Sequence, residues 1–478
     1  MQHEITEQSA SSSKESSNKM ESPIDESKQL NDGVHLMNNS AGYRYPAEPA
    51  VRKRLESFMQ LKLGLMIHWS PATQLGSIES WPLCDGDGDW SQREIDWTDR
   101  ETFKQQYWDT PKTFNPVKFD PEKWAKIAKE CGFRYVVFTS KHHDGFCMYD
   151  SAYSDYKITN PLCPFSKNPK ADILKEVIDA FRKEGMAISV YYSKPDWHHE
   201  DFWSPDFGKP TTRHANYDPS KHPEHWNRYV DFVHDQLTEL CANYGEIDVL
   251  WLDGSWIRPE INHQDIRLSE IVKKIRNTTQ PHLIVVDRTV GGENENILTP
   301  EQTVPETQMS VPWESCISIG KGFSFHYEEE LKTSYKLIHL FIDIISKGGN
   351  LALNITPQPD GSLPHAQVHT LRRFGRWVRA NEKAIYRSKI SPCRGNMAIR
   401  YTRVDDTDFA FFLYPQDPIM PNTLILNVEE GKKVNSVHHV RTNDALDFKQ
   451  DGTKLVVDTS DLSMLHAEAA ECFEISYC

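Results

Sequence analysis

The stretch DPEKWAKIAKECGFRYVVFTSKHHDGF, residues 120–146, decides the fold. Asp120 is a residue type that caps helices and Pro121 suits the first helical position, after which apolar side chains recur on one helical face. Gly132 ends this helix, because glycine readily takes the left-handed conformation that closes many helices. Residues 135–139 are aromatic or β-branched and predict a strand that is buried on both faces.

The same order of amphipathic helix, glycine or proline, and apolar strand recurs along the chain. An opening strand is expected in LKLGLMIHWS, and later copies of the whole pattern lie at residues 172–197, 229–256, 269–288 and 337–361. Strands that alternate with helices in this way form a parallel sheet covered by helices. The pattern predicts an α/β fold, a TIM-type (β/α)8-like barrel, and no GxGxxG motif follows the first strand to support a dinucleotide-binding open sheet.

The two ends of the chain follow other patterns. From about Arg394, short alternating strands such as MAIRYTRV and DFAFFLYP are separated by turn residues, which is typical of an antiparallel β-sandwich. The start is rich in Ser, Lys and Glu and poor in large apolar residues, so burial cannot offset its chain entropy. We therefore expect a disordered tail over residues 1–42, a barrel domain over 43–388 and a C-terminal β-sandwich over 389–478.

Composition excludes several classes of partner. The 478 residues carry 54 Lys and Arg against 69 Asp and Glu, a net charge of −15, which disfavours nucleic acid and anionic membranes and favours a neutral or cationic small molecule. No window is apolar enough for a membrane span and no apolar secretory signal begins the chain, so we expect a cytoplasmic protein unless a leader has been removed. The nine cysteines, without CxxC spacing, are expected to be reduced core thiols.

Polar and aromatic residues follow nearly every predicted strand. Chemistry in such barrels gathers at the carboxyl ends of the strands, so these residues should share one rim. They are His68, Trp69, His142, His143, Tyr192, Trp197, Asp253, Arg288 and Asn354. Six tryptophans in or beside these loops point to a carbohydrate ligand, although a single tryptophan is more often part of a core. The six are Trp69, Trp81, Trp197, Trp251, Trp256 and Trp313.

Asp253 and the histidine pair each have two interpretations at this stage. Asp253 ends the most apolar strand between Trp251 and Trp256, where it could act as the carboxylate nucleophile of a glycosidase or simply form the turn before Gly254. His142 and His143 could bind a metal ion or bond to the hydroxyls of a sugar, but no HxH or HExxH spacing accompanies them. A metal-dependent barrel hydrolase therefore stays open as an alternative enzyme class.

Several motifs together resemble the α-L-fucosidases of glycoside hydrolase family 29. They are LGLMIHWS, YVVFTSKHHDGF, VLWLDG, VVDRTVGG, PWESC and SKGGNLALNITPQPDG, in the order of that family and over roughly residues 45–390. Ser70 departs from the glycine that the family usually carries after His-Trp, which should not affect the chemistry. The resemblance implies an exo-acting retaining hydrolase that removes terminal α-L-fucose from oligosaccharides or glycoconjugates, without metal or cofactor.

The resemblance also implies roles for individual residues. Asp253 would be the nucleophile, and Glu301 is the favoured acid/base, ahead of Glu314 and Glu295. Substrate-binding roles are implied for His68, Glu79, Trp81, His142, His143, Tyr192, Arg288 and Glu314. A catalytically silent sugar-binding protein on the same fold is the remaining alternative. Glycosidic linkage, aglycone preference and oligomeric state cannot be read from the sequence.

Overall fold

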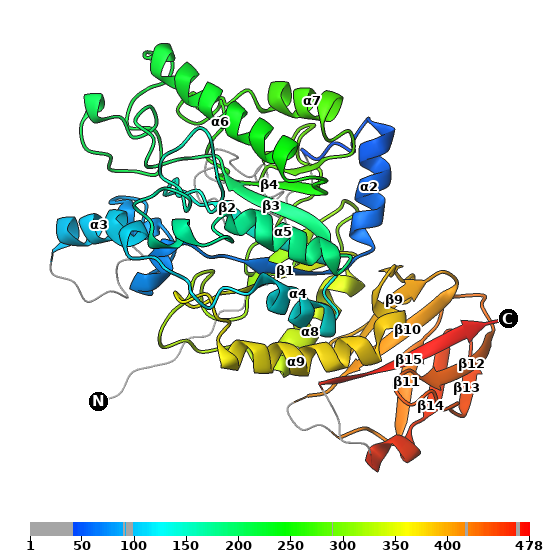
Figure 1. Cartoon of the computed structure of the whole chain (residues 1–478). Helices are drawn as coiled ribbons and strands as arrows, with labels where there is room; N and C mark the ends of the chain where they lie inside the picture. The colour runs from blue at the N-terminus through cyan, green and yellow to red at the C-terminus, as the bar shows by residue number, and fades with distance from the viewer. Residues whose placement is uncertain (1–41, 89–90, 92–98, 289, 416–418, 465–468) are drawn as a thin grey trace, which may run out of the picture.

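The computed structural model describes residues 42–88, 91, 99–288, 290–415, 419–464 and 469–478. A curled parallel sheet covered by helices is followed by two antiparallel sheets at the C-terminal end, as Figure 1 shows. The predicted fold class, a (β/α)8-like barrel followed by an antiparallel β-sandwich, is confirmed. The tail expected over residues 1–42 lies almost wholly outside the described residues.

Seven parallel strands make up the sheet, in the order β5-β4-β3-β2-β1-β7-β6. Their bounds are β1 Leu63–Ile67, β2 Tyr135–Lys141, β3 Ala187–Ser193, β4 Val249–Asp253, β5 Ile284–Val286, β6 Glu314–Ser318 and β7 Asn350–Ile355. The sequence pattern predicted six of these strands and missed β6. Each neighbouring pair runs parallel, so all seven carboxyl ends lie at one end of the sheet.

Helices surround the sheet, and α4 begins where the sequence predicted it. Asp120 caps α4, its carboxylate accepting a hydrogen bond from the backbone N–H of Lys123 at 3.0 Å, and Gly132 has the expected positive φ of 88°. The bounds are α2 Pro49–Met59, α3 Arg100–Asp109, α4 Pro121–Glu130, α5 Ile173–Lys183, α6 Pro223–Asn243, α7 Leu268–Thr278, α8 Ser334–Ser346, α9 His365–Ala380 and α10 Glu382–Ile385. None of the described helices is both long and apolar enough to cross a membrane.

An irregular segment, residues 296–302, fills the space between the two edge strands β5 and β6. At one end the backbone N–H of Asn296 donates to the carbonyl of Val285 in β5. Farther along, Leu298 forms a bridge with Trp313, just before β6, and Glu301 forms one with Cys316 inside β6. The segment therefore takes the place of an eighth strand and completes the barrel.

Alternate residues of the strands face the inside of the barrel. The inner core contains Met66, Tyr135, Val137, Tyr191, Val249, Trp251, Ile284, Val286, Ile297, Cys316 and Ala352. Their sequence neighbours pack instead against the helices, as Ile188, Val190 and Tyr192 of β3 do. Inward Gly64 makes room for Tyr135, since a Cβ at that position would lie 2.0 Å from its ring.

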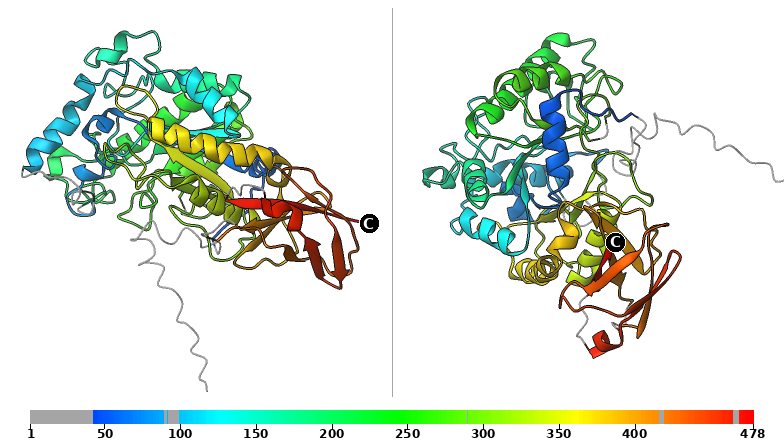
Figure 2. Two further views of the ribbon diagram at one scale, coloured as in Figure 1. Left: turned by 90° about the horizontal axis from the view of Figure 1, so that it is seen from below. Right: turned by 90° about the vertical axis from the view of Figure 1, so that its right-hand side faces the viewer.

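The C-terminal part is a pair of antiparallel sheets with its own core. One sheet has the strand order β12-β15-β10-β9-β8 and the other β11-β14-β13. The bounds are β8 Lys389–Ile390, β9 Ile399–Val404, β10 Thr407–Leu413, β11 Thr423–Asn427, β12 Val434–His439, β13 Phe448–Asp451, β14 Lys454–Asp458 and β15 Ala470–Tyr477. As Figure 2 shows, this pair of sheets lies beside α9. Eight of the nine cysteines are buried, and Cys478 is exposed.

Candidate active site

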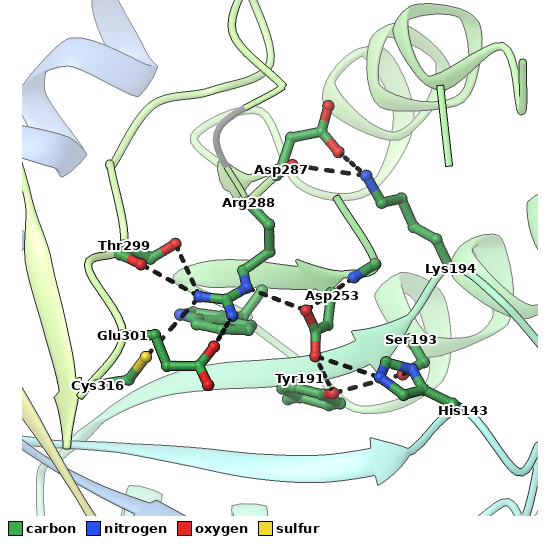
Figure 3. Close-up of polar contacts among 12 residues, drawn as sticks. His143, Tyr191, Ser193, Lys194, Asp253, Asp287, Arg288, Thr299, Glu301 and Cys316 are labelled. Atoms are coloured by element: carbon green, nitrogen blue, oxygen red, sulfur yellow. Dashed lines mark hydrogen bonds and ion pairs between the residues drawn. The ribbon is translucent and has the colours of Figure 1, made fainter. Parts of the chain in front are cut away.

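Asp253 is the carboxylate at the centre of the site. It ends β4, and its side chain is 16% exposed. Its Oδ1 accepts hydrogen bonds from the Nε of Arg288 at 3.0 Å and from the backbone N–H of Gly254 at 2.7 Å. Its Oδ2 accepts one from the Tyr191 hydroxyl at 2.5 Å, and the Nε2 of His143 lies 3.8 Å away (Figure 3). Asp253 thus forms the turn before Gly254 and also faces the other predicted site residues.

Its surroundings keep Asp253 ionised. Burial alone would raise the pKa of this carboxyl, but the Arg288 guanidinium holds the pKa well below its usual range. His143 and the Tyr191 hydroxyl add smaller effects in the same direction. A carboxylate that is nearly buried and still charged at neutral pH is suited to attack an electron-poor carbon.

Arg288 joins Asp253 to Glu301. It follows β5 with a φ of 54°, a backbone conformation that is uncommon for a side chain of this size. While its Nε bonds to Asp253, its NH2 group donates to the Oε2 of Glu301 and its NH1 group donates to the Thr299 carbonyl at 3.1 Å (Figure 3). The guanidinium also lies 4.9 Å from the centre of the Trp251 ring. A single planar cation therefore orients two carboxylates.

Glu301 faces the barrel mouth because of where it lies in the irregular segment 296–302. Ile297 belongs to the inner core, and Thr299, two residues on, bonds to Arg288. Glu301 continues this alternation at the carboxyl end of the segment, with its side chain 19% exposed. The segment that carries Glu301 is paired with β6 through the bridge from Glu301 to Cys316.

The histidines form the wall next to Asp253. His142 and His143 have ring centroids 4.1 Å apart, and each uses its Nδ1 to contact a serine hydroxyl at 2.7 Å, Ser80 and Ser193 respectively. The Nδ1 of His68 lies 2.8 Å from the Oδ1 of Asn354. These contacts leave the Nε2 atoms available to a ligand.

All three imidazoles are neutral near pH 7. Burial lowers the pKa of His68 and of His143 to about 4 and lowers that of His142 well below its usual value. A neutral imidazole can both donate and accept a hydrogen bond, which suits it to sugar hydroxyls.

Three of the six tryptophans surround His143. The ring centroids of Trp81, Trp197 and Trp256 lie 5.2, 5.3 and 5.1 Å from that of His143. Trp251 lies inside the barrel beneath Arg288. The other two belong to the core, which corrects the expectation of six rim residues. Trp69 packs against the ring of Trp124 at 5.3 Å, and Trp313 is fully buried just before the amino end of β6.

Tyr192 does not join the site, and its neighbour Tyr191 does. The Tyr192 hydroxyl accepts a hydrogen bond from the Nζ of Lys141 at 3.1 Å and donates one to Gln236 at 2.9 Å, on the helix side of the sheet. Tyr191 is paired with Trp251 in the next strand and bonds to Asp253. Successive side chains of a strand point to opposite faces, so the prediction was one residue out of register.

Glu314 lies at the other end of the barrel. It is the first residue of β6, so it stands four residues, or about 13 Å at 3.3 Å per residue, below the carboxyl end. Its carboxylate accepts hydrogen bonds from the Tyr135 hydroxyl and, at 3.2 Å, from the Nε1 of Trp251. Burial raises its pKa to about 7. These contacts place Glu314 beneath the site rather than in it.

Glu79 lies near both candidate catalytic carboxylates. Its φ is 40°, and its backbone N–H donates to the Ser324 hydroxyl at 2.7 Å. Burial, together with the charges of Glu301 and Asp253, raises the pKa of Glu79 to about 8. Its Oε1 is buried and has no hydrogen-bond partner among the described residues. A protonated carboxyl therefore stands ready for a ligand.

Glu295 is fully buried just before the irregular segment. Its Oε1 accepts a hydrogen bond of 3.4 Å from the backbone N–H of Asp287, a residue of the loop after β5. Glu295 thus contacts the backbone of Asp287, whereas Glu301 is the glutamate that Arg288 binds.

Sequence reasoning missed two residues of the site. Tyr191 could have been found from Asp253, because Ser193 pairs with Asp253 and the residue two positions earlier shares its face. Phe323 had no such signal, because it lies in a loop outside the strand pattern. Its ring centroid is 5.1 Å from that of His68, and it packs against the inner core.

His142, His143 and Asp253 also form a set that could hold a metal ion. Each offers one ligand atom, and the three atoms lie within 4.8 Å of one another. Two imidazoles and a carboxylate are ligands that Zn²⁺ accepts. The Arg288 guanidinium, however, lies 3.0 Å from the same carboxylate and opposes a divalent cation there. The charges therefore fit a neutral ligand better than a metal.

The chain is similar to known α-L-fucosidases. The family model described as Alpha-L-fucosidase matches residues 33–383. Alpha-L-fucosidase 1 of Arabidopsis thaliana is 26% identical over 57% of this chain, and the match spans only 55% of that relative. Two solved structures cover 90% of this chain and 100% of their own: alpha-L-fucosidase isoenzyme 1 from Paenibacillus thiaminolyticus, at 28% identity and a TM-score of 0.72, and Thermotoga maritima alpha-fucosidase in complex with fucose, at 26% and 0.70.

Proposed function

The chain belongs to the alpha-L-fucosidase family, and on this premise we propose that it removes terminal α-L-fucose from glycans with retention of anomeric configuration. Asp253 is the proposed nucleophile and Glu301 the proposed acid/base. The observation that carries the proposal is Arg288, which binds both carboxylates through neighbouring nitrogen atoms. In retaining glycosidases the two carboxyl groups stand about 5 Å apart, and a shared guanidinium brings them to distances of that order.

The proposed reaction has two displacements. In the first, a carboxylate oxygen of Asp253 bonds to C1 of fucose while the bond from C1 to the leaving oxygen breaks, and that oxygen takes a proton from Glu301. In the second, Glu301 takes a proton from water as the water oxygen bonds to C1, and the bond to Asp253 breaks. Glu301 is bound to Arg288, so it must turn from Arg288 toward the leaving oxygen in order to protonate it.

The sugar fits the surrounding residues by chemical type. The neutral imidazoles of His68, His142 and His143 provide donors and acceptors for hydroxyl groups. Fucose also carries a methyl group, which needs an apolar surface. Trp251 and Phe323 supply one, since both pack in the inner core beside the site.

Azide trapping tests the two proposed roles separately. Asp253→Gly should lose at least about 1,000-fold in kcat on an aryl fucoside, as removal of a nucleophile usually does. Azide should restore turnover and give the β-fucosyl azide, because it attacks the face that Asp253 leaves open. Glu301→Ala with azide should give the α-fucosyl azide, because azide then attacks the fucosyl-enzyme. Asp206→Asn, at an exposed carboxylate, is the control. A wild-type enzyme that cleaves no fucoside would reject the function itself.

Glu79 is the specific rival for the acid/base role, because its raised pKa keeps a proton on it at neutral pH. If Glu79→Ala, and not Glu301→Ala, yields the α-fucosyl azide, the role belongs to Glu79. The alkaline limb of the kcat/KM profile offers a second measurement. A limb near pH 8 in the wild type that disappears in Glu79→Gln would support the same reassignment.

A further inference from the structure

A cleft next to the proposed active site has the features of a second sugar-binding site. Its volume is about 370 Å³, within the roughly 300–1,000 Å³ that is common for small-molecule sites. Its lining includes Trp108 of α3, Trp197 and Trp203 of the loop after β3, and two lysines, Lys104 and Lys209. Trp197 is the wall that the cleft shares with the site, since its ring centroid lies 5.3 Å from that of His143.

The indole pair is held in a fixed orientation before any ligand arrives. Trp197 and Trp203 stack face to face, with ring centroids 4.8 Å apart and planes 1° apart. The Nε1 of Trp197 donates to the carbonyl of Arg213 at 3.2 Å, and the Nε1 of Trp203 donates to that of His214 at 2.9 Å. Because both indole N–H groups already donate hydrogen bonds, each ring can contact a ligand only through its apolar faces and edges. One face of Trp203 covers Trp197, and Trp203 is partly exposed where it lines the cleft, so a flat apolar surface such as that of a sugar ring can pack against it there.

The charges around the cleft suit a neutral ligand. Lys104 lies 2.5 Å from Asp85, and Lys209 lies 2.5 Å from Glu101 and 3.4 Å from Asp85. Both lysines of the lining are therefore paired with carboxylates, and Arg100 also lies 2.8 Å from Asp85. The paired groups still offer hydrogen-bond donors and acceptors, which hydroxyl groups can use.

We propose that this cleft binds a sugar residue of the fucosylated glycan other than the fucose, stacked on Trp203. The inference rests on the proposed fucosidase function and assigns part of its substrate specificity. The cleft lies on the His143 side of Asp253, whereas Glu301 lies on the Arg288 side. The sugar in the cleft is therefore a branch of the glycan, and not the sugar whose oxygen Glu301 protonates.

Substrates with and without a glycan test this proposal. α-L-Fucosyl fluoride has no sugar beyond the fucose. Further sugars are present in 2′-fucosyllactose, 3-fucosyllactose and a fucosylated, branched N-glycan. Trp203→Ala should lower kcat/KM for the best of these glycans about tenfold, chiefly through KM, as expected for the loss of one aromatic stack. Its rate on fucosyl fluoride should stay within about twofold of wild type, and Trp203→Phe should retain most of the activity on the glycan.

Controls separate the outcomes. Tyr153→Ala removes an exposed aromatic ring outside the cleft and should leave kcat/KM unchanged on fucosyl fluoride and on the glycan. If Trp203→Ala alters the melting temperature, Trp203→Leu, which keeps an apolar side chain without the ring, takes its place. The defucosylated glycan should then inhibit fluoride release more weakly in Trp203→Leu than in the wild type. Equal losses on both substrates, no loss on either, or cleavage of fucosyl fluoride alone by the wild type would overturn the cleft proposal. Cleavage of no fucoside would instead reject the fucosidase function.

Discussion

Arg288 is the residue that most constrains the chemistry. It is 4% exposed, it bonds to two carboxylates, and it lies over the Trp251 ring. Its left-handed backbone costs about 1–3 kcal/mol, a strain that recurs at functional sites. Glu79 and Gln302 also have positive φ, so strained residues flank Glu301 and the site. A lysine could not replace Arg288, because a single ammonium cannot bond two carboxylates in one plane.

A matched pair of substitutions tests the strand register at the residue scale. Tyr191→Phe should lower kcat/KM on an aryl fucoside about 10- to 100-fold, because it removes a hydrogen bond to the charged Asp253. Tyr192→Phe removes the contacts to Lys141 and Gln236 instead, so it should cost about 1–3 kcal/mol in free energy of unfolding and leave kcat nearly unchanged. Equal effects on kcat in the two variants would contradict the placement of the two side chains.

The metal alternative is tested at the same scale. Prolonged dialysis against EDTA should leave activity on an aryl fucoside unchanged, because Arg288 already neutralises the carboxylate that a metal would need. His143→Gln should lower kcat/KM, and added Zn²⁺ should restore nothing. Loss of activity on dialysis followed by recovery with Zn²⁺ would favour a metal-dependent hydrolase over the proposed mechanism.

At the scale of the element, a strand's start and end have different roles. Glu314 at the amino end of β6 is a buried, hydrogen-bonded support for Trp251, which in turn lies beneath Arg288. Asp253 at the carboxyl end of β4 faces the barrel mouth. The motif PWESC contains a glutamate that the sequence alone could not assign to one end or the other, because β6 itself was not predicted.

Glu314 should make stability depend on pH. Its pKa is raised from 4.5 to about 7, so between these values the folded state binds a proton that the unfolded state has lost. This contribution stabilises the protein near pH 5 and is lost as the pH rises through about 7, by up to about 3 kcal/mol. Glu314→Gln, which carries no titrating proton, should therefore gain in melting temperature relative to the wild type between pH 5.5 and 8.5. If the difference in melting temperature between Glu314→Gln and the wild type does not vary with pH, the pKa of Glu314 is not raised.

Strand periodicity predicted the regular elements and failed at the irregular ones. The pattern from Asp120 to Lys141 was recognisable because a cap, a helical face and an apolar run follow one another. No helix precedes residues 296–302 or β6, and both hold only short apolar runs. The sequence therefore predicted neither β6 nor the pairing of Glu301 with Cys316. Glu301 was favoured from family resemblance and its position after Arg288, not from periodicity.

At the scale of the whole molecule, the C-terminal sheets cover the barrel. Phe409, Phe411 and Leu413 of β10 pack in the same cluster as the helices of the barrel, while Phe412 faces the core between the two sheets. The Nε1 of Trp377 in α9 donates to the carbonyl of Ala470 in β15 at 2.9 Å. Among the described residues, none of those that form the site comes from these sheets, so their contribution to activity is indirect.

A truncated chain tests this dependence. Ending the chain after Ser388 uncovers the apolar side of α8 and α9, so the shortened protein should aggregate in size-exclusion chromatography. In the full chain, Phe411→Ala should cost about 3–5 kcal/mol in free energy of unfolding, because it leaves a cavity at the junction. A soluble, fully active chain of 388 residues would show that the barrel needs no cover from the sheets.

The bridges that hold residues 296–302 have a consequence for how this enzyme can diversify. Seven strands are bound in continuous ladders, but Glu301 is carried by a segment attached through isolated bridges. Asn296, Leu298 and Glu301 tie this segment to its neighbours, so insertions or deletions between residues 290 and 295 can be absorbed ahead of it without unpairing a strand. Libraries that vary the length of this stretch can therefore reshape the surroundings of the site while Glu301, the proposed proton donor, stays against Arg288.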